Sequence, residues 1–248
     1  MRQSHQSDPR VLGQRTLQHD HRRLAALLRP GMHVLDAGCG TGSITAGIAA
    51  AVGPQGSVTG LDRDESLLAI ARQDYCGIAN LEFQTGDLLQ FNSAPRFDIV
   101  TAARLIQWIS EPAEAVRRMA AATKPGGLAV ALDYNHGLNS WTPDPPIEFR
   151  MFYGKFLAWR AANGWDNMMG DHLPALFAGA GLHHIKTYSD DEITQRGSTI
   201  WLHVIQSLGP KILEKESERA AAEAAYRDYL ETSLITQRLS LRTVIGEA

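Results

Sequence analysis

The chain contains little cysteine, no excess of positive charge and no long apolar run. Its 248 residues include two cysteines, Cys39 and Cys76, and no Cys/His cluster has the spacing of a zinc site. We therefore expect no metal site, no disulfide framework and a reducing, cytoplasmic setting. With 24 basic and 27 acidic residues the formal net charge is −3, which gives no indication of a nucleic-acid or anionic-membrane partner.

The apolar segments are also too short for a membrane protein. None approaches the roughly 20 residues that span a bilayer, and residues 1–20 lack the apolar core of a signal peptide. The sequence predicts a soluble, unexported protein without a membrane partner. A P-loop motif for nucleotide phosphates is absent as well.

Strand-like and helix-like segments alternate in the first 134 residues. This alternation is typical of βαβ units with right-handed crossovers, which build a parallel sheet with a ligand crevice at the carboxyl ends of its strands. The expected strands are 33–36, 57–62, 81–84, 97–102 and 128–134, and the expected helices are 17–28, 41–52, 64–76 and 112–123.

The pattern changes after Tyr134. Residues 135–171 carry three tryptophans and a Pro-Asp-Pro-Pro turn, which indicates a helical insertion with its main helix at 146–162. The remaining expected elements are helices 173–180, 199–208 and 217–232, a strand at 184–188, and a final edge strand at 238–245 for which an antiparallel direction is considered.

These elements predict a single α/β domain over residues 1–248. We expect a doubly wound, mostly parallel, seven-stranded Rossmann-like sheet with helices on both faces and a helical insertion after the fifth strand. Its expected parts are an N-terminal helical lid at 1–29, a cofactor-binding core at 30–134, a substrate cap at 135–170 and the C-terminal part of the fold at 171–248. The Ala-rich segment 217–232 could support a homodimer, and a monomer is equally compatible with the sequence.

The main functional signal is the segment 34–42, which reads V-L-D-A-G-C-G-T-G. Glycines permit positive φ and a close approach of ligand to backbone, and the following helix N-terminus favours a ligand carboxylate. A dinucleotide site has the spacing G-x-G-x-x-G, but Ser43 stands at the last of these positions. Asp36 would repel a pyrophosphate and suits a ligand with an ammonium group and a sulfonium.

Two further acids lie at or just beyond the ends of expected strands. Asp62 lies twenty residues beyond Gly42, where a carboxylate can accept hydrogen bonds from both ribose hydroxyls. Asp87 follows the third strand and is placed to accept from an adenine amino group, with Leu88 against the ring. Asp36 could instead be a structural acid at a strand end, and Asp87 could simply cap a turn.

Four segments in this order resemble motifs of the class I S-adenosylmethionine-dependent methyltransferases, in their UbiE-like, small-molecule branch. Residues 34–42 resemble motif I, 60–62 resemble motif II, 85–88 resemble the adenine-binding segment, and 97–127 are similar to that branch. The resemblance covers about residues 25–134, and Gln107 stands near a position where the family often has His or Asn.

The resemblance implies S-adenosylmethionine as cofactor and S-adenosylhomocysteine as product. It implies that Asp36 and the glycines hold the methionine part, Asp62 the ribose, and Asp87 with Leu88 the adenine, while Arg15 in a lid-like segment pairs with the cofactor carboxylate. The full set of expected cofactor contacts is Arg15, Asp36, Gly38, Cys39, Gly40, Asp62, Arg63, Gly86, Asp87, Leu88 and Arg104.

The substrate side is less defined by the sequence. We expect in-line methyl transfer to an oxygen, nitrogen or carbon nucleophile of a small, partly apolar or aromatic molecule. His136 is a candidate general base, against the alternative of a loop histidine, and no acid–base pair is evident. Trp108, His136 and Trp141 are the candidate substrate contacts.

The sequence remains compatible with three other functions. One is a nucleic-acid or protein methyltransferase, although the chain has no N/D-P-P-Y-type signature after the fourth strand. Another is a protein that binds S-adenosylmethionine without catalysis. The third is an NAD-dependent oxidoreductase, which the glycine spacing disfavours.

Overall fold

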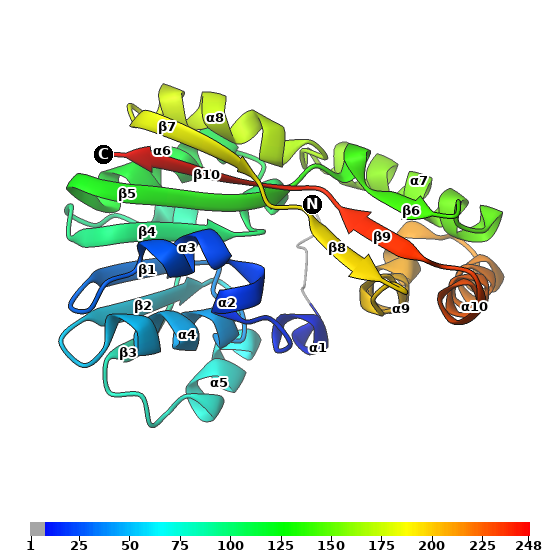
Figure 1. The fold of residues 1–248 in the computed structure, drawn as a ribbon, viewed down its shortest axis with the longest axis horizontal. Coiled ribbons are helices and arrows are strands. Elements are labelled where there is room, and N and C mark those ends of the chain that lie inside the picture. Colours follow the sequence, from blue (N-terminus) through cyan, green and yellow to red (C-terminus); the bar gives the residue numbers. More distant parts are fainter. Residues whose placement is uncertain (1–7) are drawn as a thin grey trace.

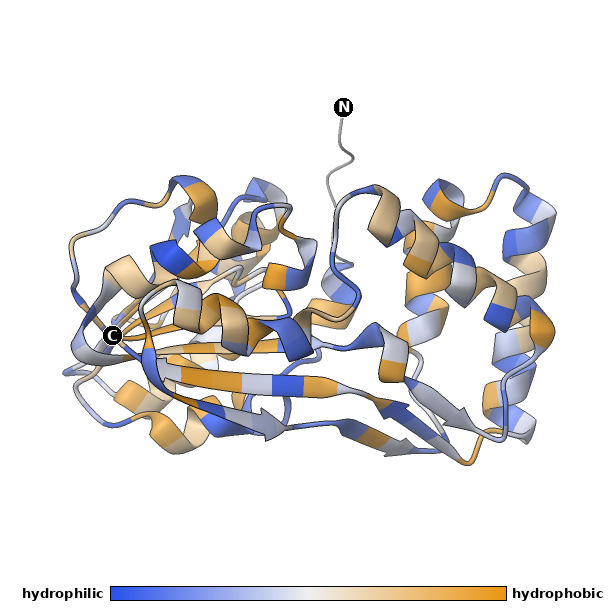
Figure 2. Cartoon of the chain, turned by 90° about the horizontal axis from the view of Figure 1, so that it is seen from above, coloured by the Kyte–Doolittle hydropathy of each residue, from blue (hydrophilic) through white to orange (hydrophobic). Residues whose placement is uncertain are grey.

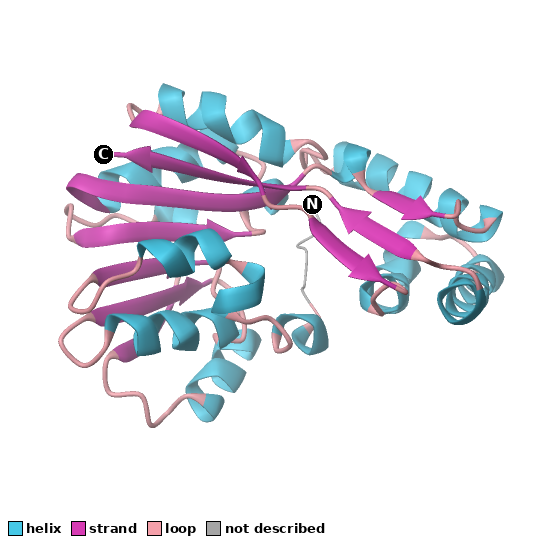
Figure 3. Cartoon of the chain, in the orientation of Figure 1, coloured by secondary structure: helices cyan, strands magenta, loops and turns pink. Residues whose placement is uncertain are grey.

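The computed structural model describes residues 8–248, and its centre is a seven-stranded sheet in the order β3-β2-β1-β4-β5-β10-β7 (Figures 1 and 3). Strands β3, β2, β1, β4 and β5 are parallel neighbours, and β10 runs antiparallel to both β5 and β7. The predicted fold class is confirmed. The strands are β1 His33–Ala37, β2 Ser57–Asp62, β3 Leu81–Thr85, β4 Phe97–Ala103, β5 Thr123–Tyr134, β7 His183–Ser189 and β10 Leu241–Glu247.

The expected position of the final strand at the sheet edge is wrong, whereas the antiparallel direction considered for it is right. Strand β10 is antiparallel, but it inserts between β5 and β7, so β7 is the edge. The burial explains this order, because Val244 of β10 is fully buried whereas every residue of β7 is exposed or half-buried. A strand with so many solvent-facing residues suits a sheet edge.

Alternating side chains of β1 serve two separate cores. Val34 packs with helices α2 to α4 on one face, and Leu35 packs with α6 and α8 on the other. Both faces of the sheet are thus covered, as a buried parallel sheet requires. The main helices of this unit are α4 Ser43–Val52, α5 Glu65–Asp74, α6 Pro112–Ala122 and α8 Met169–Gly179.

The N-terminal segment differs from the single helix expected at 17–28. It forms α1 Pro9–Leu12, α2 Leu17–Asp20 and α3 Arg22–Leu27, with a break at His21 (φ −147°). The break lets the His21 ring point inward, where Nε2 lies 2.9 Å from Oγ1 of Thr101 in the sheet. Residues 1–7 of the expected lid lie outside the described residues.

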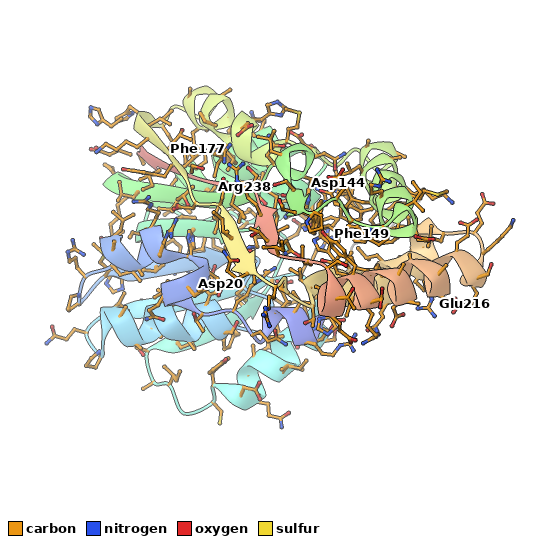
Figure 4. The ribbon with its side chains drawn as sticks, turned by 45° about the vertical axis from the view of Figure 1, so that its right-hand side comes forward. Asp20, Asp144, Phe149, Phe177, Glu216 and Arg238 are labelled. Atoms are coloured by element: carbon orange, nitrogen blue, oxygen red, sulfur yellow. The ribbon has the colours of Figure 1, made fainter. Side chains whose placement is uncertain are left out.

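A second, smaller unit lies beside the main sheet (Figure 1). Its antiparallel three-stranded sheet has the order β6-β9-β8, and three helices pack against one another around an aromatic core. Figure 2 shows both units from above, and Figure 4 places Phe177 in the main unit and Phe149 in the second. The elements of this unit are β6 Ser140–Thr142, β8 Glu192–Gln195, β9 Thr236–Leu239, α7 Ile147–Ala162, α9 Ile200–Ile212 and α10 Glu216–Thr232.

Two chain segments run continuously from one sheet into the other. Only Asp190 and Asp191 separate β7 from β8, and only Ser240 separates β9 from β10. The Asp191 carboxylate accepts the Leu241 amide at 3.0 Å and pairs with Arg238 of β9, which is labelled in Figure 4. The second unit therefore contains 192–239 as well as the helical insertion that follows β5.

No helix within residues 8–248 is both long and apolar enough to cross a membrane.

Candidate active site

A cavity of about 670 Å³ opens at the carboxyl ends of β1, β2, β3 and β4 and extends to the second unit. Its volume lies in the range of small-molecule sites, about 300–1,000 Å³. One end is lined by the loops after these strands, and the other by side chains of α7 and α9. The cavity is thus at the crevice that an open α/β sheet provides for ligands.

The loop between β1 and α4 forms one wall of the cavity with its backbone. Gly38 and Gly40 line the cavity and have φ values of +74° and +55°. A Cβ atom at Gly38 would come within 2.8 Å of Leu105 Cδ1, and one at Gly40 within 2.8 Å of Leu12 Cδ1. The positive φ values favour glycine at both positions, and a Cβ atom at either one would also displace a leucine side chain.

Asp62 is held at the end of β2 by two backbone donors. Its Oδ2 accepts the Gly40 amide at 2.8 Å and its Oδ1 accepts the Asp64 amide at 2.9 Å. The side chain also lines the cavity. A carboxylate has about four acceptor positions, so acceptor capacity remains for a ligand's hydroxyls.

The next strand contributes an acceptor and an apolar surface. Oδ1 of Asp87 accepts the Leu89 amide at 2.9 Å, whereas Oδ2 has no partner among residues 8–248. Gly86, Asp87 and Leu88 all line the cavity, and Leu88 is buried. The pair of Asp87 and Leu88 suits a flat base with an amino group.

Arg15 and Arg104 both reach the cavity but differ in their partners. Arg104 is buried and donates to Tyr134 Oη at 3.1 Å and to Glu192. Burial opposes its charge, but Tyr134, Glu192 and Asp20 hold the pKa of Arg104 above its usual range. Figure 4 shows Asp20 beside β8, the strand of Glu192.

The guanidinium of Arg15 has no hydrogen-bond or ion-pair partner in the part of the chain that the structure describes, and it lines the cavity. Burial lowers the pKa of Arg15, and the charge of Arg104 lowers it further. An unpaired cation in this position is a binding group for an anion.

The structure does not bring every expected cofactor residue to the cavity. Arg63 does line it, but Asp36 and Cys39 do not. Oδ2 of Asp36 accepts from Thr45 Oγ1 of α4 at 2.7 Å, and Sγ of Cys39 packs towards Gly60 of β2. Burial raises the pKa of Asp36 to about 7, with the Thr45 hydroxyl opposing this change and the charge of Asp62 adding to it.

At the other end, the cavity is largely aromatic and aliphatic. Trp108 and His136 line it, but Trp141 packs behind it, with ring centroids 5.3 Å from Phe149 and 6.0 Å from Trp201. The lining residues at this end that are not among the three candidate substrate contacts include Tyr134, Phe156, Trp201, Val204, Leu208 and Leu239. They come from four different elements, and no local motif marks them.

His136 is fixed by contacts on several sides. Its Nε2 lies 2.8 Å from Gln107 Oε1, its ring stacks on Tyr134 at 5.0 Å, and it meets Phe156 edge-on at 5.6 Å. Burial lowers the pKa of His136 well below its ordinary value, and the charge of Arg160 acts in the same direction. The imidazole is therefore neutral near pH 7.

No group of three or more His, Cys, Asp or Glu side chains within residues 8–248 could hold a metal ion.

Comparison with known proteins assigns the family. Residues 28–170, more than half of the chain, match a family described as "Methyltransferase domain". The chain belongs to the class I S-adenosylmethionine-dependent methyltransferases. The resemblance inferred from the four motifs is thereby confirmed.

Demethylmenaquinone methyltransferases of Staphylococcus aureus are 31% identical over 133 residues, which is 52% of this chain and 53% of theirs. The alignment thus spans about half the length of these curated relatives.

Solved structures share the fold at low identity. Protein BH2331 of Bacillus halodurans, described as a candidate methyltransferase, has a TM-score of 0.60 at 18% identity, covering 98% of this methyltransferase and 99% of that chain. Phosphoethanolamine N-methyltransferase 2 of Haemonchus contortus, in complex with phosphomonomethylethanolamine and S-adenosylhomocysteine, has a TM-score of 0.60 at 16% identity, covering 92% and 52%.

Proposed function

We propose that this methyltransferase transfers the methyl group of S-adenosylmethionine to an oxygen, nitrogen or carbon nucleophile of a small, largely apolar molecule. One observation carries the proposal. A single cavity joins a polar end, with Asp62 and Asp87, to an apolar end, with Phe156 and Trp201. Two ligands can therefore lie side by side in one cavity, and this proximity is the main requirement of a direct transfer.

The residues of the polar end fit the cofactor. Asp62 would accept the ribose hydroxyls, and Asp87 with Leu88 would hold the adenine. The backbone at Gly38 and Gly40 leaves space for the methionine part, and the unpaired Arg15 would take its carboxylate. Bound there, the cofactor supplies a methyl group already activated by a positively charged sulfur.

The other expected cofactor residues receive modified roles in this proposal. Arg63 and Gly86 border the ribose and adenine positions, and Arg104 ties the end of β4 to Glu192. Asp36 would act from behind the glycine loop through Thr45 of α4, rather than by touching the cofactor. Cys39 would serve as a filler between the loop and β2.

The substrate would bind at the apolar end, between the N-terminal segment and the second unit. Trp108 and His136 lie there, and α9 adds Trp201, Val204 and Leu208. We include in this proposal a single functional domain over 1–248, with 1–29 as lid and 135–170 as part of the cap. The name of the Staphylococcus aureus relatives makes a demethylated quinone one member of the substrate class to test.

A nucleic-acid or protein substrate is the weaker alternative, because the formal net charge is −3 and the cavity end is apolar. A protein that binds the cofactor without transferring its methyl group is the other alternative.

The test is isothermal titration with S-adenosylmethionine, S-adenosylhomocysteine and NAD, followed by transfer of labelled methyl groups to a panel of phenols, amines and a demethylated quinone. Binding of the first two ligands, with a methylated product from the panel, is the expected result. Binding of NAD alone would refute the cofactor assignment. Cofactor binding with methylation of RNA or peptides alone would refute the substrate class.

A further inference from the structure

We propose that Nδ1 of His136 accepts a hydrogen bond from an O–H or N–H group of the substrate, and so selects flat, largely apolar molecules that carry such a donor. This inference rests on the proposed function and narrows its substrate class. Three observations carry it: the orientation of Gln107, the absence of another partner for Nδ1 in residues 8–248, and the aromatic surfaces around the ring.

Gln107 determines which imidazole nitrogen carries the proton. Its Nε2 donates to the carbonyl oxygen of Arg104 at 3.3 Å, so its Oε1 is the atom that faces His136 at 2.8 Å. An amide oxygen only accepts, so Nε2 of His136 must carry a hydrogen. In a neutral imidazole the other nitrogen is then a bare acceptor. Nδ1 of His136 is that acceptor.

The surroundings hold the ring neutral and in place. Arg160 is fully buried nearby, with its guanidinium donating to the Gln107 carbonyl oxygen at 3.1 Å, and it disfavours a second positive charge on His136. The backbone of His136 is held from both sides, because its amide donates to the Asn167 carbonyl and its carbonyl accepts from Tyr153 Oη. Rotation of the ring would break the bond to Gln107.

Nδ1 is buried and has no hydrogen-bond partner among the described residues. A buried acceptor without a partner costs about 1–3 kcal/mol, which a ligand's donor would recover. His136 belongs to the cavity wall, beside Tyr134, Phe156 and Trp201. These rings offer flat apolar surfaces, so the expected ligand is a planar molecule whose donor is directed at Nδ1.

The first test uses a matched pair of probes, 2-naphthol and 2-fluoronaphthalene, titrated into protein saturated with S-adenosylhomocysteine. They have nearly the same shape, but only the naphthol donates a hydrogen bond. The wild-type protein should bind the naphthol at least about fivefold more tightly. Equal affinities, or no binding of the naphthol, would overturn the inference.

Three variants separate hydrogen bonding from packing. His136→Phe keeps a flat ring without an acceptor, and its preference for the naphthol should fall to about one. His136→Asn retains an oxygen close to the position of Nδ1 and should keep most of the preference. Gln107→Leu removes the bond that selects the tautomer, so its preference should be reduced. An unchanged preference in His136→Phe would exclude His136 as the acceptor.

A second measurement needs no ligand. Nitrogen NMR of ¹⁵N-labelled protein distinguishes bare from protonated imidazole nitrogens, and the His136→Phe spectrum assigns the His136 signals. A bare Nδ1 with a protonated Nε2 is expected, and the opposite tautomer would overturn the inference. If S-adenosylhomocysteine failed to bind, the proposed function would fall, but the tautomer and the naphthol preference of the free protein would still decide the role of His136.

Discussion

Oδ2 of Asp62 accepts the amide hydrogen of Gly40 at 2.8 Å, so the acid that ends β2 also fixes the glycine loop that follows β1. Its other oxygen accepts the Asp64 amide at the start of α5. The carboxylate thus links three segments around the proposed cofactor site. Binding and local order at this site should therefore depend on the same side chain.

Replacement of Asp62 should weaken cofactor binding in steps. Asp62→Asn keeps one acceptor but loses the charge, and hydrogen bonds to charged groups contribute about 1.5–3 kcal/mol, so affinity for S-adenosylhomocysteine should fall roughly 10- to 100-fold. Asp62→Ala frees both backbone amides and should lower the melting temperature as well. Calorimetric titration and thermal unfolding measure the two effects. Asp74→Asn, at the end of α5 and off the cavity, is the control, and a loss of less than twofold in Asp62→Asn would contradict the assignment.

Arg15 should recognise the carboxylate of the cofactor. Arg15→Met should weaken binding of S-adenosylhomocysteine about tenfold or more but leave 5′-methylthioadenosine, which lacks the amino-acid part, nearly unaffected. The same change should raise the melting temperature of the free protein, because it removes a cation that desolvation and the charge of Arg104 both disfavour. Arg117→Met, at an exposed position of α6 off the cavity, is the matched control. Equal losses for both ligands would argue against a carboxylate contact.

A methyl group at position 40 should disturb the loop in two separable ways. Gly40→Ala brings a Cβ within 2.8 Å of Leu12 Cδ1 and places alanine at φ +55°. We expect a loss of more than about 1 kcal/mol in unfolding free energy and weaker cofactor binding. Adding Leu12→Ala should relieve only the contact, so the double variant should recover binding in part. Urea unfolding and titration test this, and Gly154→Ala, on a helix with open space around it, should bind as the wild type does.

Most residues of the polar end of the cavity could be predicted from the sequence, because each of its features is local. Asp62 is the last residue of β2 and Asp87 lies two residues beyond the end of β3, and parallel strands bring their carboxyl ends to one edge. Asp36 shows where this reasoning stops. It lies next to the glycines in sequence, but its carboxylate is bound by Thr45 of α4. The direction in which a side chain at a strand end points depends on how the strand packs against its neighbours, and a short sequence motif does not determine that packing.

Most of the apolar end of the cavity could not be predicted, because it is assembled from distant segments, although Trp108 and His136 were expected there. Phe156, Trp201 and Leu239 reach the cavity through the packing of α7, α9 and the β6-β9-β8 sheet. The long-range pairings of that sheet have no local signature, since Trp141 in a three-residue strand could face either side. Trp141 packs against Phe149 and does not line the cavity. The tryptophan of the second unit that lines the cavity is Trp201, which the sequence did not indicate.

His21 should make the stability of the fold depend on pH. Burial lowers the pKa of His21 to about 3, and the charge of Arg104 adds to this effect, whereas an unfolded histidine titrates near 6.5. Below pH 6.5 the unfolded chain therefore takes up a proton that the folded chain does not accept until about pH 3. The contribution of His21 is complete above pH 6.5 and is lost as the pH falls, by about 2–3 kcal/mol at pH 4.5.

The variant His21→Gln isolates this contribution from that of the buried carboxyls. Asp36 and Asp133 have pKa values raised to about 7 and respond in the opposite direction, but they are common to both proteins. Glutamine can still reach Thr101 and does not titrate, so from pH 7 to 4.5 the variant should lose about 2–3 kcal/mol less than the wild type in urea unfolding followed by tryptophan fluorescence. The exposed His183→Gln should follow the wild type. Parallel pH profiles for wild type and His21→Gln would mean that His21 is accessible to protons in the folded state, and the inward position of its ring would then be wrong.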